Sequence, residues 1–317
     1  MSIIDRTTAF YRGRAIFTLN GVTLYPGPQP ALIKTTTDYV TVPVAGQGVI
    51  DKKIKQITTE ITLVPHGAIS APILALLYPH TNPIPGASAM PSTDQALVVW
   101  PANSHEKLTF PSAFVSKMPE LYLSAVKMAF GQMTITCIGR NAEAWTVADH
   151  FVKVEDATFA DVSGAGIALV VPYTASLGSL TAPWNNILTK SGWTFSPNIA
   201  LDAREEDSIG IFDYLYKEEH TCSVKCNPIG LKVADLHGLK LLEGSGAARG
   251  ASATGLKQVL TITGGSGNPI LVVNNCVLDT AQHQYGDDDR VGELEFTTVR
   301  SLTAGALNAL FSIGLNA

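Results

Sequence analysis

A β-strand is predicted by the segment Ile54-Lys55-Gln56-Ile57-Thr58-Thr59-Glu60-Ile61-Thr62-Leu63-Val64, in which apolar and polar residues alternate. The strand is expected to stop at Pro65-His66-Gly67, because proline and glycine interrupt ladder pairing. Residues 215–226 form a second long strand-like segment, and Asn227-Pro228-Ile229-Gly230 stops it in the same manner. Two such segments in opposite halves of the chain predict a mainly β protein.

Shorter elements surround each of these segments. Asn20-Gly21 divides the strand-like run 16–24 and is a strong signal for a hairpin turn. A helix is predicted over 69–78, with Ser70 as its N-cap and Pro72 in its first turn. Residues 79–91 are rich in proline, glycine and serine and are predicted to be an extended loop. A second helix is predicted over 233–242, a strand pair over 193–201, and strands over 97–100, 107–115, 132–138, 258–263, 269–278 and 292–299.

The order of these elements is repeated, which indicates an internal duplication. Residues 131–136 align with residues 292–297 at an offset of 161, and Pro65 aligns with Pro228 at an offset of 163. The first strands, at Phe17 and Trp193, give an offset of 176. The larger offset predicts about 13 extra residues in the first copy, and a long loop at about 38–53 is expected to hold them. The predicted organisation is a first domain at 1–145, a linker or inserted strands at 146–191, and a second domain at 192–317.

Composition excludes several classes of protein. Of 317 residues, 15% are charged and 46% are hydrophobic, which argues against a disordered chain. The net charge of −5 argues against a protein that grips nucleic acid, because phosphate binding needs a basic surface. The most apolar run, residues 166–171, is too short to cross a bilayer, and residues 1–6 lack the apolar core of a signal peptide. We therefore expect no membrane association.

No residue pattern points to catalysis, a metal or a cofactor, and we expect none of these. The seven histidines form no HxH or HExxH pair, and each is expected to lie on the surface or in a loop. Cys222 and Cys226 would share one face of a strand but lie roughly 13 Å apart, too far to bind one zinc ion. We expect these two cysteines, and also Cys137 and Cys276, to pack in the core.

Acidic residues gather at 205–207, 218–219 and 287–289. Solvated turns are the simplest interpretation of these clusters, and an acidic lining that faces a channel is the alternative. Paired carboxylates also serve calcium binding or acid–base catalysis. The run Asp287-Asp288-Asp289 lacks the alternate spacing of a calcium-binding loop.

Each half of the chain resembles the tail tube fold of phage tails and related injection machines. That fold is a small β-sandwich or barrel flanked by one helix, with a long loop between early strands. The resemblance covers most of the chain, and residues 38–53 stand where the family has its inter-ring loop. It implies a mainly β chain with two tandem tail-tube-like β-sandwich or barrel domains, each with one flanking helix. The matching segments are the strands 54–64 and 215–226, the helices 69–77 and 233–242, and the closing strands 132–138 and 293–299.

The resemblance also implies a function. Subunits of that family close into six-fold rings, and the rings stack into a hollow tube through which DNA passes without specific binding. Two copies of the fold per chain imply homotrimeric, pseudo-hexameric rings, with hexameric rings as the alternative. The implied location is the virion tail, after synthesis in the host cytoplasm. The implied partners are the chain itself and other tail proteins, namely the tape measure, the terminator and the baseplate or hub.

Two segments are expected to contact neighbouring subunits. Inter-ring contacts are expected from the long loop, at Asp38, Gly46, Gln47, Gly48 and Lys53. Residues 301–317 carry no charge. This segment is expected to dock on a neighbour through Leu307, Leu310 and Phe311.

Three other functions remain open from the sequence. A tail hub, terminator or distal tail ring would keep the fold but stop at one ring. A β-rich carbohydrate-binding or adhesin module would need exposed aromatic residues on one face, and an enzyme would need a site of unrecognised pattern. The four tryptophans are scattered along the chain, at Trp100, Trp145, Trp184 and Trp193.

Overall fold

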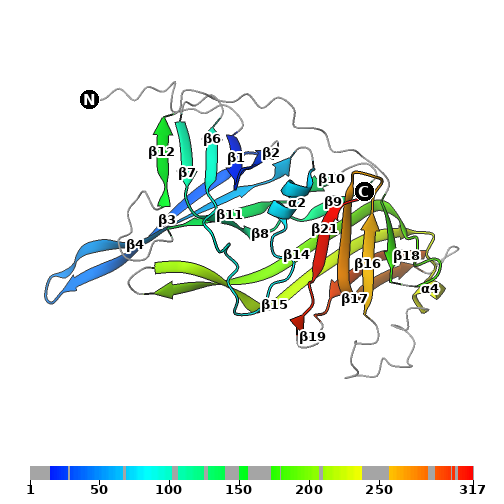
Figure 1. Cartoon of the computed structure of the whole chain (residues 1–317). Helices are drawn as coiled ribbons and strands as arrows, with labels where there is room; N and C mark the ends of the chain where they lie inside the picture. Colours follow the sequence, from blue (N-terminus) through cyan, green and yellow to red (C-terminus); the bar gives the residue numbers. More distant parts are fainter. Residues whose placement is uncertain are drawn as a thin grey trace.

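The structure is a computed structural model of the whole chain (Figure 1). It describes residues 15–27, 29–66, 69–101, 106–124, 128–139, 150–155, 173–178, 180–206, 210–237, 257–284, 290–300, 302–303 and 306–316. These residues are mainly β, as the sequence predicts.

The described strands form four sheets. A six-stranded sheet has the order β12 (Val152–Glu155), β7 (Glu106–Phe110), β6 (Leu97–Pro101), β1 (Ala15–Leu19), β2 (Val22–Pro26), β5 (Pro65–His66). A four-stranded sheet has the order β3 (Leu32–Val44), β4 (Gly48–Leu63), β11 (Met133–Ile138), β8 (Ala113–Lys117). The largest sheet has the order β10 (Met128–Phe130), β9 (Leu121–Leu123), β14 (Leu188–Glu206), β15 (Gly210–Ile229), β18 (Arg290–Thr298), β17 (Pro269–Gln284), β16 (Gln258–Thr263), β13 (Thr174–Leu177), and β21 (Phe311–Leu315) also pairs with β17. The strands β19 (Leu302–Thr303) and β20 (Ala306–Leu307) pair with each other.

Local signals place several elements correctly. The β1–β2 hairpin turns at Asn20-Gly21, and both residues have positive φ, of 49° and 76°. Asparagine and glycine tolerate that backbone conformation better than other residues do. The helix α2 (Ala71–Leu77) begins after Ser70, whose Oγ accepts a hydrogen bond from the Ile73 N–H. These two predictions are confirmed.

Other predicted elements have different bounds. The predicted strand 107–115 is divided into β7 and β8 at residues 111–112, and the predicted strand pair 193–201 is part of the single strand β14. The second helix, α4 (Val233–His237), begins where it was predicted, and the predicted residues 238–242 lie outside the described part of the chain.

The strand order of the four-stranded sheet recurs in the largest sheet. The order β3-β4-β11-β8 corresponds to β14-β15-β18-β17. In the first group Leu63 pairs with Met133, and in the second group Cys226 pairs with Leu294. The members of these two pairs are separated by 163 and 161 residues, the two offsets found in the sequence.

The third sequence offset, of 176 residues, matched strands that are not equivalent. Phe17 lies in β1, which pairs with β2 and β6. Trp193 lies in β14, which pairs with β15 as β3 pairs with β4. Residues 38–53 therefore have a counterpart in the second half, and they are not an insertion.

One apolar core spans both halves of the chain. It contains Phe17 and Leu63 from the first half and Phe195, Phe296 and Phe311 from the second. All five side chains are buried. The Phe195 and Phe311 rings lie 4.9 Å apart between centroids, in an edge-on arrangement that aromatic rings favour.

Candidate assembly surface

The β3–β4 hairpin extends from the body as a two-stranded ribbon (Figure 1). Nearly all of β3 and the first seven residues of β4 are exposed. Two-stranded ribbons are only marginally stable alone in water, and an exposed apolar surface marks an interaction site. The ribbon is therefore the first candidate for a contact with another molecule. Five of its apolar side chains are 50–57% exposed, namely Tyr39, Val40, Val49, Ile50 and Ile54.

All five residues predicted to make inter-ring contacts lie on this ribbon. Gly46 and Gly48 stand on either side of Gln47 in the turn and have φ of +78° and +77°. Asp38 and Lys53 are exposed on β3 and β4. The prediction of a long loop at 38–53 is wrong, because the threonine, valine and isoleucine residues there continue both strands.

A second long hairpin, β14–β15, projects from the same side of the body (Figure 1). Its outer part follows the same register as the first hairpin. The second strands begin at Gly48 and Gly210, both with positive φ. Each second strand then has a β-bulge at the same step, at Ile50 in β4 and at Phe212 in β15. The outer parts of the two hairpins are equivalent at the level of single residues.

The two hairpins contact each other through Gln56, which is 4% exposed. Its Nε2 donates to the backbone oxygen of Ile211 at 3.1 Å, and its Oε1 accepts from the Ile211 N–H at 2.7 Å. Gly210 makes room for this side chain, since a Cβ at that position would lie 2.9 Å from Gln56 Oε1. Lys55 adds an ion pair with Glu205 at 3.1 Å.

The hairpins carry opposite charge. Between residues 48 and 55, three lysines accompany one aspartate. Between residues 202 and 219, seven acidic residues accompany two basic ones. The ion pair between Lys55 and Glu205 is one contact between these surfaces inside the chain. The acidic residues 205–206 and 218–219 thus belong to the second hairpin, whereas Asp207 and residues 287–289 lie outside the described residues.

Residues 84–90, which we call the strap, cover the edge of β15 that faces away from β14. Gly86 N–H donates to Tyr216 O at 2.9 Å, and Ala89 N–H donates to Tyr214 O at 2.7 Å. Ser88 lies opposite Leu215 in an antiparallel bridge. The strap comes from the first half of the chain and the strand comes from the second.

Side chains hold both the strap and the residues just before it. Ser88 Oγ donates to Asp213 Oδ1 at 2.6 Å. Arg300 donates to the backbone oxygen of Pro83, and also to Asn82 Oδ1 at 2.9 Å. The strap is thus an ordered connection between the halves, although the sequence indicated only an extended loop there.

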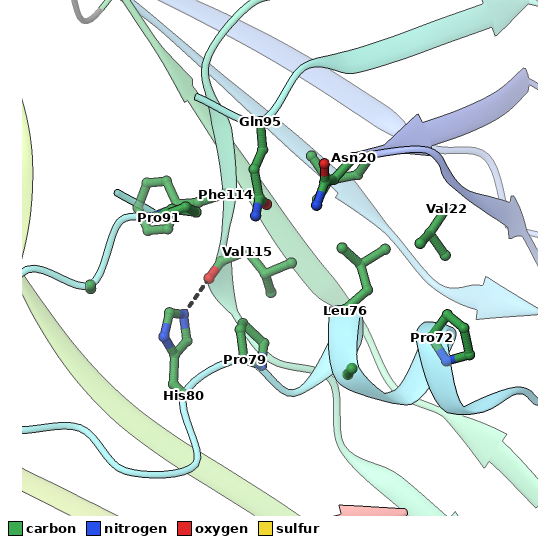
Figure 2. Close-up of a pocket in the computed structure, with 13 residues that line it drawn as sticks. Asn20, Val22, Pro72, Leu76, Pro79, His80, Pro91, Gln95, Phe114 and Val115 are labelled. Carbon is green, nitrogen blue, oxygen red and sulfur yellow. Dashed lines mark hydrogen bonds between the residues drawn. The ribbon is translucent and has the colours of Figure 1, made fainter. Parts of the chain in front are cut away.

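His80 lies just before the strap, on the wall of a cavity of about 300 Å³ (Figure 2). Its Nε2 donates to the Val115 carbonyl at 2.5 Å. A neutral imidazole then has Nδ1 as an acceptor, and Tyr216 O–H donates to it at 2.8 Å. The cavity is lined mainly by apolar side chains such as Leu76 and Phe114, and it brings together no acid, base and nucleophile.

The histidine prediction is wrong for His150 and His220, which are buried, whereas His80 lies in a loop as predicted but is buried as well. Burial lowers the pKa of His80, the Val115 carbonyl partly raises it, and the nearby His220 lowers it again. Burial also lowers the pKa of His150. For His220, burial and then the Arg300 charge lower the pKa, while the Lys217 backbone raises it. Of the three, His220 lies in the strand β15, whereas His80 follows α2 and His150 precedes β12.

The cysteine prediction is confirmed. All four cysteines are free and buried, and burial raises the pKa of each thiol. A raised pKa keeps a thiol protonated and unreactive. Within the described ranges, no group of three histidine, cysteine, aspartate or glutamate side chains is placed to hold a metal ion.

The C-terminal segment lies on its own chain. Leu310 and Phe311 are 2% and 0% exposed, and β21 pairs with β17. The sequence suggested that these two side chains dock on a neighbour, but they are buried in their own chain. Leu307 lies in β20, and its side chain is outside the described part of the structure.

Sequence reasoning missed Gln56, Gly210 and the strap. One signal was available, since residues 48–55 read Gly-Val-Ile-Asp-Lys-Lys-Ile-Lys and residues 210–217 read Gly-Ile-Phe-Asp-Tyr-Leu-Tyr-Lys. Glycine, aspartate and lysine recur at the same three places. Aligning these segments would have identified the second hairpin.

No protein-family model matches this sequence, and a search of curated proteins finds no match either. In the described part of the chain, no helix has the length and apolar character needed to cross a membrane.

Proposed function

We propose that this chain is a structural subunit that assembles with copies of itself into rings, and that the rings stack into the hollow tube of a phage tail. The chain would be a major tail protein in the virion, and the tube would conduct DNA during delivery. Its two halves would be tandem tail-tube-like domains, so that three chains make a pseudo-hexameric ring.

One observation carries this proposal. The two equivalent hairpins differ in what covers them, because β15 is paired along its edge by the strap whereas the outer part of β4 is exposed. Exposed strand edges invite pairing with another chain. We expect the second half of another copy of the chain to cover this exposed edge, as the strap covers β15 within one chain.

The direction of the contact inside the chain favours rings. The first half supplies Gln56 and the strap, and the second half supplies β15. If the second half offers the corresponding surface to the first half of the next copy, the contact is head-to-tail. Contacts of this kind close into rings or propagate as filaments.

Charge supports the same pairing. The basic outer part of the first hairpin suits the acidic second hairpin, and Lys55 with Glu205 already makes this contact within one chain. Two first hairpins, or two second hairpins, would repel each other because their charges are alike. This repulsion favours alternation of the two kinds of hairpin around a ring. The remaining exposed residues at Gly46, Gln47 and Gly48 are then free for contacts between rings. The tape measure, the terminator and the baseplate or hub would contact the finished tube.

Negative-stain electron microscopy of the purified protein, at low and high concentration, tests the proposal. Hollow tubes of stacked rings are the expected result, with a ring mass of three chains. Single rings at every concentration would favour a hub, terminator or distal ring, while compact monomers at every concentration would overturn self-assembly.

A further inference from the structure

The strap has a copy in the sequence. Residues 86–89 read Gly86-Ala87-Ser88-Ala89, and residues 250–253 read Gly250-Ala251-Ser252-Ala253. The two segments are 164 residues apart, close to the offsets of 161 and 163 that relate the paired strands. Residues 250–253 lie outside the described part of the chain. The repetition of the strap sequence suggests that the second half also supplies a strap.

The strand that a second strap would cover is identified by register. In the outer hairpins, Val42 pairs with Asp51 and Arg204 pairs with Asp213. Both members of the first pair are 162 residues before those of the second. The strap lies beside residues 213–216 of β15, so the corresponding residues of β4 are 51–54.

Corresponding aspartates in the two hairpins, Asp213 and Asp51, are oriented by the same kind of hydrogen bond. Asp213 Oδ1 accepts from the Tyr214 N–H at 2.8 Å and also from Ser88 Oγ at 2.6 Å. Asp51 Oδ1 accepts from the Lys52 N–H at 2.7 Å. The carboxylate of Asp51 thus has the orientation that holds a strap serine in the second hairpin.

The two strand edges differ in exposure. Residues 213–216 are half-buried, whereas residues 51–54 are all exposed, and Ile54 is 51% exposed. Among the described residues, nothing pairs with the β4 edge at residues 51–54 on the side away from β3. The β4 edge at residues 51–54 is therefore left uncovered by the described residues, and the Asp51 carboxylate beside it is oriented to accept a hydrogen bond.

The elements that flank residues 250–253 in the sequence lie far from the uncovered edge. Residues 250–253 are between α4 and β16, and Figure 1 shows both of these elements at the end of the molecule opposite the tip of the β3–β4 hairpin. A second copy of the chain can bring its residues 250–253 to this edge directly.

We infer that residues 250–253 of one copy pair antiparallel with residues 51–54 of a second copy, as residues 86–89 pair with residues 213–216 within one chain. This inference rests on the proposed self-assembly and specifies which segments join neighbouring chains. The register places Ser252 opposite Lys53, with the Ser252 hydroxyl donating to Asp51. Gly250 N–H donates to Ile54 O, and Ala253 N–H donates to Lys52 O.

Disulfide cross-linking of the full-length protein tests the register. The variant S252C/K53C places one cysteine on each side of the expected contact. Directly opposite residues in neighbouring strands lie within the Cα distance that a disulfide spans. The four natural cysteines are buried, so they compete little. The matched control is S88C/L215C, because these residues are opposite each other within one chain.

The expected results separate the two contacts. After mild oxidation, S88C/L215C should give a cross-linked monomer at every concentration. S252C/K53C should give covalent multimers, up to closed rings. An equal mixture of the single variants K53C and S252C should give covalent dimers and nothing larger, since each chain then carries one engineered thiol. Microscopy of each sample reports assembly independently.

Three outcomes would overturn the inference. A cross-linked monomer from S252C/K53C would mean that residues 250–253 lie on the same chain. Rings or tubes without cross-links would refute this register while leaving the proposed function intact. Absence of both cross-links and assembly, with the S88C/L215C control cross-linked and folded, would refute the inference and the proposed function together.

Discussion

The side chain of Gln56 takes the place of a neighbouring strand opposite Ile211. Its amide accepts from the Ile211 N–H at 2.7 Å and donates to the Ile211 carbonyl at 3.1 Å. An amide side chain has the same donor and acceptor as a peptide unit, so it can satisfy both backbone groups at once. Gln56, which is buried, thus joins the β3–β4 hairpin to the start of β15.

Replacing Gln56 with alanine should destabilise the chain by about 1–3 kcal/mol, because it leaves the two Ile211 backbone groups without their partner. Urea unfolding, followed by circular dichroism, measures the change. Lys55→Ala is the matched control, since its partner Glu205 is half exposed and an exposed ion pair contributes less than about 1 kcal/mol. Equal losses from the two variants would contradict the role given to Gln56.

Gly210→Ala should destabilise the protein more than Gly48→Ala. Both residues have positive φ, of 79° and 77°, so both substitutions carry the same backbone strain of about 1–2 kcal/mol. Only at Gly210 would the new Cβ meet Gln56, at 2.9 Å, whereas the space around Gly48 is open. The difference in urea midpoint between the variants reports this contact, and identical midpoints would show that Gln56 moves aside without cost.

Stability should fall as the pH drops below about 6.5, the ordinary pKa of histidine. The pKa of His80, His150 and His220 is lowered in the folded chain, so the unfolded chain binds protons first on acidification. The stability is fully present above pH 6.5 and is lost down to the lower folded-state pKa values. Urea midpoints between pH 7.5 and 5.0 measure the loss.

His80→Gln should make this loss shallower, because one of the three titrating groups is removed. His66→Gln, the same substitution at an exposed position, is the control. An unchanged slope in His80→Gln would assign the acid sensitivity to other groups.

Deletion of Gly46, Gln47 and Gly48 should weaken stacking of rings while leaving the chain folded. These residues form the tip of an exposed ribbon and contact no part of the core. Tube length in micrographs and the far-ultraviolet circular dichroism spectrum give the two readouts. Tubes of normal length from the deletion variant would remove the tip from the inter-ring contact.

Phe311→Ala should cost about 3–5 kcal/mol, as expected for truncation of a fully buried phenylalanine. Its ring packs against Phe195 and Tyr78. Leu315→Ala, in the same strand but 36% exposed, should cost far less. Thermal unfolding of the two variants provides the comparison, and a small effect at Phe311 would revive the expectation that this segment docks on a neighbour.

Strong local signals made much of the fold predictable. Asn20-Gly21 specifies its turn by backbone preference alone, and Ser70 with Pro72 specifies the start of α2. The alternation around Ile61 and Leu63 reports a buried face, because both side chains pack in the core. In each case the cause lies within a few residues of the signal.

The candidate assembly surface depends on contacts that are distant in sequence. Gln56 reaches Ile211 across 155 residues, and Ser88 reaches Asp213 across 125 residues. A single sequence holds no signal that the Gln56 amide or the Ser88 hydroxyl has so distant a partner. Leu310 and Phe311 were misassigned for a related reason, since an uncharged segment packs equally well on its own chain or on another.

The pairing of the strap with β15 has a kinetic consequence for any ring of whole chains. Half of the seams in such a ring lie inside single chains, where the local concentration of the two partners is set by the connecting polypeptide and not by the amount of protein. These seams form during folding, before two chains meet. The seams between different chains alone depend on the protein concentration. Each collision between chains therefore adds a preassembled pair of hairpins. It follows that a closed ring contains an even number of hairpins.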